Sequence, residues 1–162
     1  MPRLSAGIVL FRRRNLALEV FLVHPGGPFW KNKDLGAWSI PKGEFETGDD
    51  PLQAAQREFE EETGSHLAPG PFISLGEVRQ KGGKIVTAWA IEGDIDAANI
   101  RSNTFTMEWP PRSAKSQQFL EVDRAAWFGL AEAREKLLAG QHPFLDRLAL
   151  AAGGEGPGDR SM

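Results

Sequence analysis

The sequence predicts an α/β fold in which helices pack on a mixed β-sheet. Two adjacent segments, 5–13 and 17–24, are rich in β-branched and apolar residues, as strands are. A well-capped helical segment at 51–63 follows them, and strand-like segments resume beyond it. Strands and helices are thus interspersed, but no strand–helix–strand series repeats, which favours a mixed sheet over a parallel one.

The first two strands flank a turn signal at 14–15 and are expected to pair. The stretch 25–36 is rich in Gly, Pro and Lys and is expected to be a loop. Segments 72–80 and 84–91 flank the sequence KGG at 81–83, which predicts a second hairpin.

The C-terminal part is expected to contain a short strand at 126–128 and two helices at 130–139 and 143–151. Gly140 is placed to end the first of these helices. Residues 152–162 are rich in Gly and polar residues, cannot bury apolar surface, and are expected to be a disordered tail.

A chain of 162 residues with 41% hydrophobic and 25% charged residues suits one globular domain, expected at residues 1–151. Cysteine is absent, which excludes disulfides, thiolate catalysis and zinc sites built on sulfur. No apolar run approaches the roughly 18 residues of a membrane span. The arginines near the N-terminus follow the apolar stretch rather than precede it, unlike those of a signal peptide. We therefore expect a cytoplasmic protein with no membrane partner.

Acidic residues are concentrated in segment 44–62, which holds eight of the chain's 22 acids and a single base, Arg57. The rest of the chain is mildly basic. This distribution fits a solvated acidic helix face, or a cation site whose surroundings attract an anion.

The helix at 51–63 has the clearest terminal signals in the chain. Asp50 is placed to cap it, Pro51 suits its first position, and Gly64 suits the left-handed position after its end. Its apolar residues share one face, which is expected to pack on the sheet.

Three glutamates share another sector of this helix at relative positions i, i+3 and i+4: Glu58, Glu61 and Glu62. Each like-charged pair destabilises an exposed helix by about 0.2–0.5 kcal/mol. A divalent cation turns this repulsion into binding, and Mg²⁺ prefers a few carboxylates combined with water and substrate phosphate oxygens. Arg57 lies one turn before Glu61, where it can pair with that carboxylate and fix its orientation.

Segment 43–65 resembles the Nudix box, G-x5-E-x7-R-E-U-x-E-E-x-G-U, in which U is a bulky apolar residue. The matching positions are Gly43, Arg57, Glu58, Phe59, Glu61, Glu62 and Gly64. Asp49 stands where the box has Glu, and Ser65 stands where it has an apolar residue. The shorter aspartate leaves open any outer metal contact at that position.

The resemblance implies the Nudix fold, an α/β/α sandwich around a mixed β-sheet. It also implies hydrolysis of a nucleoside diphosphate linked to another group, with Mg²⁺ or Mn²⁺ as cofactor. Glu58 would be a metal ligand or the general base, Glu62 a metal ligand, and Glu61 a ligand steadied by Arg57. In such a reaction the metal neutralises phosphate oxygens, and a carboxylate takes the proton of the attacking water.

The lead-in to the box, WSIPKG at 38–43, is similar to that of dinucleoside polyphosphate and diphosphoinositol polyphosphate hydrolases. Lys42 is expected to hold a substrate phosphate, and Arg79, near a strand end, another. Trp38 is expected to pack in the core. The aromatic candidates for stacking on a purine are Trp30, Trp89 and Trp109. Other bases that could meet further phosphates are Arg12, Arg13, Arg14, Lys81 and Lys84.

Nudix enzymes often add one metal-binding carboxylate from outside the box, for which Glu108 and Glu121 are the candidates. The segment 104–115 mixes a carboxylate, aromatics, bases and prolines and is expected to be a loop. The sequence of this segment is also similar to that of a bacterial group of predicted nucleotide pyrophosphohydrolases, and the similarity extends over nearly the whole chain. None of the three histidines, His24, His66 and His142, has metal-ligand spacing, and all are expected to be structural or surface residues.

The favoured function is hydrolysis of a nucleoside polyphosphate, either a dinucleoside polyphosphate or a nucleoside triphosphate. One alternative is a diphosphoinositol polyphosphate hydrolase, whose highly anionic substrate would require a denser basic rim. Another is a catalytically silent nucleotide sensor, against which the three retained glutamates argue. The expected partner is a small-molecule nucleotide and not a nucleic acid polymer, and the protein is expected to be a monomer or a homodimer.

Overall fold

The structure is a computed structural model that describes residues 3–153. Its centre is a six-stranded sheet formed by β1 (Leu4–Arg14), β2 (Ala17–Pro25), β3 (Lys42–Glu44), β4 (Ile73–Arg79), β5 (Ile85–Glu92) and β8 (Val122–Gly129). The strand order is β4-β5-β1-β2-β8, and β3 pairs with β1. β1 and β5 run parallel, whereas the other neighbours are antiparallel, so the predicted mixed sheet is confirmed.

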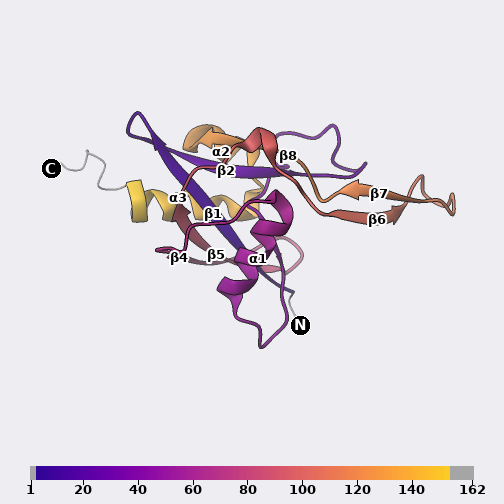
Figure 1. Ribbon diagram of the computed structural model, residues 1–162, viewed down its shortest axis with the longest axis horizontal. Helices are drawn as coiled ribbons and strands as arrows, with labels where there is room; N and C mark the ends of the chain where they lie inside the picture. The colour runs from indigo at the N-terminus through magenta and orange to yellow at the C-terminus, as the bar shows by residue number, and fades with distance from the viewer. Residues whose placement is uncertain (1–2, 154–162) are drawn as a thin grey trace.

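Helices cover both faces of this sheet (Figure 1). The helical elements are α1 (Pro51–Thr63), α2 (Leu130–Lys136), α3 (His142–Leu148), 3₁₀ turns at Ala97–Asn99 and Ala139–Gln141, and a π-helical turn at Ala149–Gly153. α1 packs on one face, and α2 and α3 pack on the other. This is the α/β/α arrangement that the sequence predicts. No helix in residues 3–153 combines the length and the hydrophobicity needed to cross a membrane.

β1 shows why the strands are nearly continuous in apolar residues. Ile8 and Leu10 pack in the cluster that contains Phe59 of α1, whereas Val9 and Phe11 pack in the cluster that contains α2 and α3. Alternate side chains of a strand point to opposite faces, so a strand covered on both sides has no polar face. β3 pairs with the N-terminal half of β1, and Gly43 of β3 lies against Glu58 of α1.

Two helix ends differ from the prediction. α2 ends at Lys136 and not at 139, because Leu137 leaves the helix to enter the core, where it is 1% exposed. The backbone of Trp38 then forms hydrogen bonds to the residues on either side of Leu137: its amide donates to the Lys136 carbonyl, and its carbonyl accepts from the Leu138 amide. α3 continues as the π-helical turn, in which Ala152 is buried. Of the predicted disordered tail, residues 154–162 lie outside the described part of the chain.

β8 is longer than predicted, since it spans eight residues and not only 126–128. Its additional residues pair with the end of β2, in a register that carries a bulge between His24 and Pro25. These residues form a strand because they pair with β2, about a hundred positions earlier in the chain. Local composition does not predict such pairing.

The expected loop at 104–115 is instead largely a β-hairpin. β6 (Thr104–Glu108) pairs antiparallel with β7 (Ser116–Leu120), and the hairpin projects from the body of the molecule (Figure 1). We refer to residues 104–120 as the arm. Phe105 and Met107 alternate with polar residues, which is a strand signal, and the two prolines fall in the connection, where no ladder hydrogen bond is lost.

Candidate active site

The predicted caps of α1 are confirmed. Its buried residues show which side of the helix packs on the sheet. The Asp50 carboxylate accepts from the Gln53 amide at 3.1 Å. Gly64 takes the left-handed conformation, with φ 76°, and its amide donates to the Glu60 carbonyl. Ala55 and Phe59 are fully buried against the sheet. The glutamate-bearing sector lies beside this buried face, where its side chains are half-buried.

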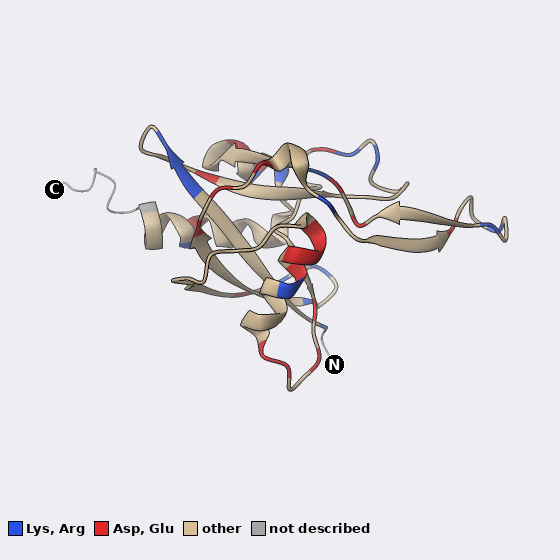
Figure 2. Ribbon diagram, in the orientation of Figure 1, with Lys and Arg blue, Asp and Glu red and all other residues tan. Residues whose placement is uncertain are grey.

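Three half-buried glutamates of the box lie together in the C-terminal half of α1, where Figure 2 shows the densest acidic colour. A fourth carboxylate, Glu121, lies beside them between β7 and β8. We refer to Glu58, Glu61, Glu62 and Glu121 as the glutamate cluster. A pocket of about 180 Å³ is lined by Val23, Pro25, Ser39, Ile40, Lys42, Glu62 and Glu121. The structure thus brings the box, its lead-in and Glu121 to one place.

Burial and mutual repulsion shape the charge of this cluster. Burial is the main reason that the pKa of Glu62 is raised to about 8; the charge of Lys42 opposes this shift, and the charges of Glu58 and Glu121 add to it. Burial and then the charge of Glu61 raise the pKa of both Glu58 and Glu121. Carboxylates raise each other's pKa in this way where too few positive charges surround them. A divalent cation supplies that missing charge.

Lys42 provides the principal positive charge at the pocket. Its backbone amide donates to the Glu62 carboxylate. Burial, and then the neighbouring ammonium of Lys84, lower the pKa of the Lys42 side chain, although Glu62 opposes this shift. Two ammonium groups held close together are a favourable place for an anion.

A larger pocket of about 470 Å³ adjoins the cluster pocket and shares Pro25, Ser39 and Lys42 with it. Its other lining residues are Trp30, Ala37, Gln80, Lys81, Lys84, Leu138, Ala139 and Gly140. We refer to this pocket as the lysine cleft. The combination of a carboxylate cluster with an adjoining cation-lined cleft suits a metal-assisted reaction on a polyphosphate.

Arg57 has a different partner from the one that the sequence suggests. Its Nη2 lies 4.0 Å from Glu58 Oε2, and no ion pair with Glu61 occurs in the part of the chain that the structure describes. The physical reason is the position of Glu58, whose carboxylate bends back over Gly43 of β3 and so lies beside Arg57. Arg57 can therefore orient Glu58 rather than Glu61.

Gly43 is required by this approach of Glu58. A Cβ atom at Gly43 would lie 2.0 Å from Glu58 Cδ, a distance that no side chain tolerates. The first glycine of the box thus makes room for Glu58, the glutamate that follows Arg57.

We predict that Gly43→Ala displaces Glu58 and lowers activity more than tenfold, but destabilises the fold by no more than about 1 kcal/mol, because the atoms that must move belong to the end of a flexible side chain. For a chain of this size each kcal/mol lowers Tm by about 2–4 °C. Gly129→Ala is the matched control, because no atom lies within 4 Å of a Cβ at that position. Equal activity of the two variants would contradict this role of Gly43; steady-state kinetics and thermal melts measure both effects.

The remaining predicted site residues lie outside the cluster. Glu108 is at the distal end of β6, where its carboxylate accepts from the Ala114 amide at 2.7 Å. Arg79 is exposed at the end of β4 and does not line the lysine cleft, although its neighbours Gln80 and Lys81 do. Trp109 lies in the arm, edge-on to Phe29 with ring centroids 5.3 Å apart. Of the two carboxylates considered outside the box, the structure brings only Glu121 to the cluster.

Several residues that shape the site carry no sequence signal. Gln141 is fully buried, and its carboxamide accepts from the Ile40 amide at 3.0 Å and donates to Gln80 Oε1 at 2.8 Å. It also donates to Ser39 Oγ at 3.0 Å. Since Ser39 and Gln80 both line the lysine cleft, Gln141 holds two of its walls together.

The position of Glu121 depends on backbone hydrogen bonds. Its amide donates to the Asn103 carbonyl, and the Asn103 amide donates to the carbonyl of Glu61 in α1. On the other side, the Gly26 amide donates to the Glu121 carbonyl at 2.9 Å. Glu121 is thus tied both to the helix of the box and to the loop after β2.

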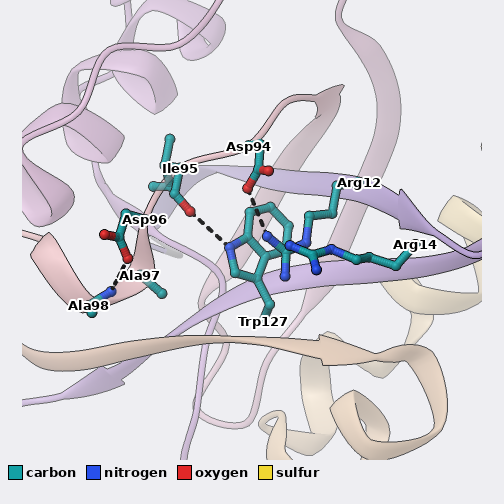
Figure 3. Close-up of a pocket in the computed structure, with 8 residues that line it drawn as sticks. All are labelled: Arg12, Arg14, Asp94, Ile95, Asp96, Ala97, Ala98 and Trp127. Atoms are coloured by element: carbon teal, nitrogen blue, oxygen red, sulfur yellow. Dashed lines mark hydrogen bonds and ion pairs between the residues drawn. The ribbon is translucent and has the colours of Figure 1, made fainter.

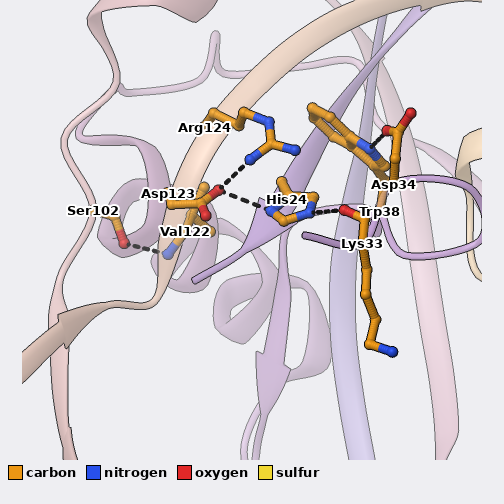
Figure 4. A network of polar contacts seen from close by, with 8 residues as sticks. All are labelled: His24, Lys33, Asp34, Trp38, Ser102, Val122, Asp123 and Arg124. Atoms are coloured by element: carbon orange, nitrogen blue, oxygen red, sulfur yellow. Dashed lines mark hydrogen bonds and ion pairs between the residues drawn. The ribbon is translucent and has the colours of Figure 1, made fainter. Parts of the chain in front are cut away.

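The loop after β2 is held by a buried network (Figure 4). The ring nitrogens of His24 contact the Asp123 carboxylate at 2.9 Å and the Lys33 carbonyl at 2.7 Å. Trp38 Nε1 donates to Asp34 Oδ1 at 2.8 Å. Trp38 is only 4% exposed, so its predicted core position is confirmed. His24 is likewise a structural residue, as predicted.

A further pocket, of about 540 Å³, lies at the opposite end of β1 (Figure 3). Its Arg12 guanidinium stacks over the Trp127 ring at 4.1 Å. Arg12 also pairs with Glu19 and Asp94, each at 2.8 Å. Because these charges already compensate one another, this pocket lacks the excess carboxylate charge found at the cluster.

Known proteins resemble this chain in sequence. Residues 1–148 match the NUDIX domain family. The chain is 26% identical over 156 residues to an asymmetrical bis(5'-nucleosyl)-tetraphosphatase of Sus scrofa, with 90% of this chain and 97% of that protein covered. It is 31% identical over 136 residues to an octanoyltransferase of Myxococcus xanthus, covering 84% of this chain. It is 37% identical over 62 residues to an RNA pyrophosphohydrolase of Erythrobacter litoralis, covering 38% of this chain. The chain spans only 33% and 34% of the length of these last two proteins.

Solved structures share the fold. An Ap4A hydrolase of C. elegans in a binary complex superposes with a TM-score of 0.65 at 20% identity, covering 93% of this chain and 98% of that one. A mutT/nudix family protein of Listeria innocua gives a TM-score of 0.63 at 22% identity, covering 96% and 97%. The fold, the box residues and the match over residues 1–148 agree, and the chain belongs to the NUDIX domain family.

Proposed function

We propose that this protein hydrolyses a phosphoanhydride bond of a nucleoside polyphosphate, with Mg²⁺ or Mn²⁺ as cofactor. The observation that carries the proposal is the proximity of Glu121 to the glutamates of the box, next to Lys42. A carboxylate cluster for a divalent cation and an ammonium for phosphate are the two requirements of such a reaction.

The residues present fit a hard divalent cation. Mg²⁺ and Mn²⁺ favour carboxylate oxygens over nitrogen and sulfur, and the glutamate cluster offers only carboxylates. As the side chains stand, no three ligand groups in residues 3–153 already converge on one point. Rotation about the glutamate side-chain torsions would therefore accompany binding. When bound, the cation would neutralise phosphate oxygens and make water more acidic.

The side chains of this chain perform the remaining tasks. Lys42 and Lys84 would hold phosphate oxygens and orient the polyphosphate chain along the lysine cleft. Glu58 would accept the proton as the water oxygen attacks phosphorus and the bridging P–O bond breaks, with the phosphate chain leaving as an anion. Arg57 would orient the Glu58 carboxylate.

A dinucleoside polyphosphate is the substrate class that we favour. The Sus scrofa relative, a bis(5'-nucleosyl)-tetraphosphatase, is covered over nearly its whole length. The lysine cleft, with a volume of about 470 Å³ beside the cluster pocket, also provides room for additional phosphates.

The test is product release by the full chain with Mg²⁺ or Mn²⁺. The panel contains diadenosine tetraphosphate, the four nucleoside triphosphates and a diphosphoinositol polyphosphate. We expect hydrolysis of a nucleotide member and loss of that hydrolysis on chelation. Tight nucleotide binding without turnover of any member would contradict the proposal and favour a nucleotide sensor.

A further inference from the structure

We propose that the arm and the loop at 26–36 together form a binding surface for a second nucleoside of the substrate. This inference rests on the proposed function, in which the polyphosphate lies in the lysine cleft. The second nucleoside is the one that a mononucleotide lacks. A dinucleoside polyphosphate and a 5'-triphosphorylated RNA both present one.

The arm and the loop contact each other at two places. Phe105 of β6 packs on Gly27, since a Cβ there would lie 3.0 Å from Phe105 Cζ. Farther out, Trp109 packs edge-on to Phe29. Trp30, which follows Phe29, lines the lysine cleft. The loop thus links the cleft to the arm: Trp30 lines the cleft, and its neighbour Phe29 contacts the arm.

The chemistry of this surface suits a base attached to a phosphate chain. Phe29 is 60% exposed, so its ring is available for a flat ligand. The same two segments contain four bases: Lys31 and Lys33 in the loop, and Arg112 and Lys115 in the connection of the arm, and Figure 2 shows basic colour on both segments. None of these four forms an ion pair with any residue in the described range 3–153. Aromatic rings interleaved with unpaired cations are typical of surfaces that bind nucleotides without reading their sequence.

The acids nearby do not neutralise these cations. Asp34 is paired with Lys136 at 2.6 Å and also accepts from Trp38. Glu108 accepts from the Ala114 amide and keeps its negative charge. The four bases outnumber this one carboxylate, so the potential of the surface is positive, opposite in sign to the charge of a polyphosphate.

The loop and the base of the arm are both held in place by hydrogen bonds to the body of the protein. The loop is fixed through the Lys33 carbonyl on His24, and the base of the arm is fixed through Glu121 and Gly26. The arm extends four residues beyond Leu120 along β7, or about 13 Å at the rise of a strand. A surface held in place before binding loses little freedom when the ligand arrives. A substrate anchored at the cluster would meet it with its distal nucleoside.

The variant Phe29→Ala tests the surface without touching the cluster or the lysine cleft. We expect KM for diadenosine tetraphosphate to rise about 5- to 100-fold, the effect of losing one base–aromatic stack. The kcat for this substrate and KM for ATP should stay within about twofold, because ATP carries no second nucleoside. Phe29→Trp keeps a stacking ring and should restore KM. Leu150→Ala is the matched control, since Leu150 is 82% exposed away from this surface.

Binding of the same two ligands to the Glu58→Gln variant, with and without Phe29→Ala, separates this inference from the proposed function. Loss of the preference for the dinucleotide supports the surface even if no panel member is hydrolysed. Turnover with equal effects of Phe29→Ala on both ligands overturns it while the proposed function stands. A 5'-triphosphorylated oligonucleotide identifies the source, because its affinity depends on Phe29 only if RNA supplies the second nucleoside. A dimer that Phe29→Ala dissociates, with both affinities lowered alike, would also overturn the inference, since the surface would then be a contact between copies.

Discussion

Replacing Glu58 by glutamine is expected to lower kcat by about 10²- to 10⁴-fold, the usual contribution of general acid–base catalysis. Glutamine keeps the shape of the side chain but cannot accept a proton or carry a charge. Burial and the proximity of Glu61 raise the pKa of Glu58, which makes it a better proton acceptor than an exposed carboxylate. Steady-state kinetics on the best substrate of the panel measure the effect.

Glu60→Gln provides the matched control for this prediction. Glu60 lies on the same helix, but its carboxylate contacts the exposed His66 at 2.8 Å and not the cluster. We expect its kcat to stay within about twofold of wild type. If Glu58→Gln keeps more than a tenth of the activity, or if both variants lose it equally, Glu58 has no catalytic role.

The pH dependence of stability is expected to reveal the buried charge of Glu62. In the unfolded chain this carboxyl titrates near 4.5, whereas in the folded, metal-free protein its pKa is about 8. Between these values the folded state binds the proton more strongly than the unfolded state does. The stabilisation is therefore complete below about pH 4.5 and is lost as pH rises through about 8.

Glu62→Gln removes this dependence and is expected to raise Tm at pH 8 by about 2 °C or more relative to wild type, with little change at pH 5. The melts are recorded with a chelator present, and Glu60→Gln again serves as control. Addition of Mg²⁺ should stabilise wild type most at pH 8, since the cation binds the ionised carboxylate. An equal difference between the variants at both pH values would show that Glu62 is not buried in this way.

The parts of the site predicted correctly from sequence depend on local signals. Asp50 and Gly64 mark the ends of α1, and the 3.6-residue repeat places the box glutamates in a sector beside the apolar face that contains Phe59. These interactions act within one helix, so the sequence contains the necessary information. The core position of Trp38 follows equally from its apolar surroundings.

What could not be predicted depends on contacts distant in sequence. Local sequence does not distinguish Glu108 from Glu121 as a metal ligand. The pairing of β6 with β7 places Glu108 at the distal end of the arm and Glu121 beside α1. The partner of Arg57 likewise depends on β3, because Gly43 determines where Glu58 bends. The side chain of Gln141 donates a hydrogen bond to Gln80, 61 positions earlier in the chain, and no sequence motif predicts this contact.

The central claim is that the glutamate cluster binds a divalent cation, and calorimetric titration of the full chain with Mn²⁺ tests it most directly. We expect saturable binding that weakens at least tenfold in Glu62→Gln and in Glu121→Gln and persists in Glu60→Gln. A polyphosphate in the cell should strengthen the binding, because its oxygens complete the coordination of the cation. The absence of any Mn²⁺ uptake, or equal uptake by all four proteins, would contradict the claim.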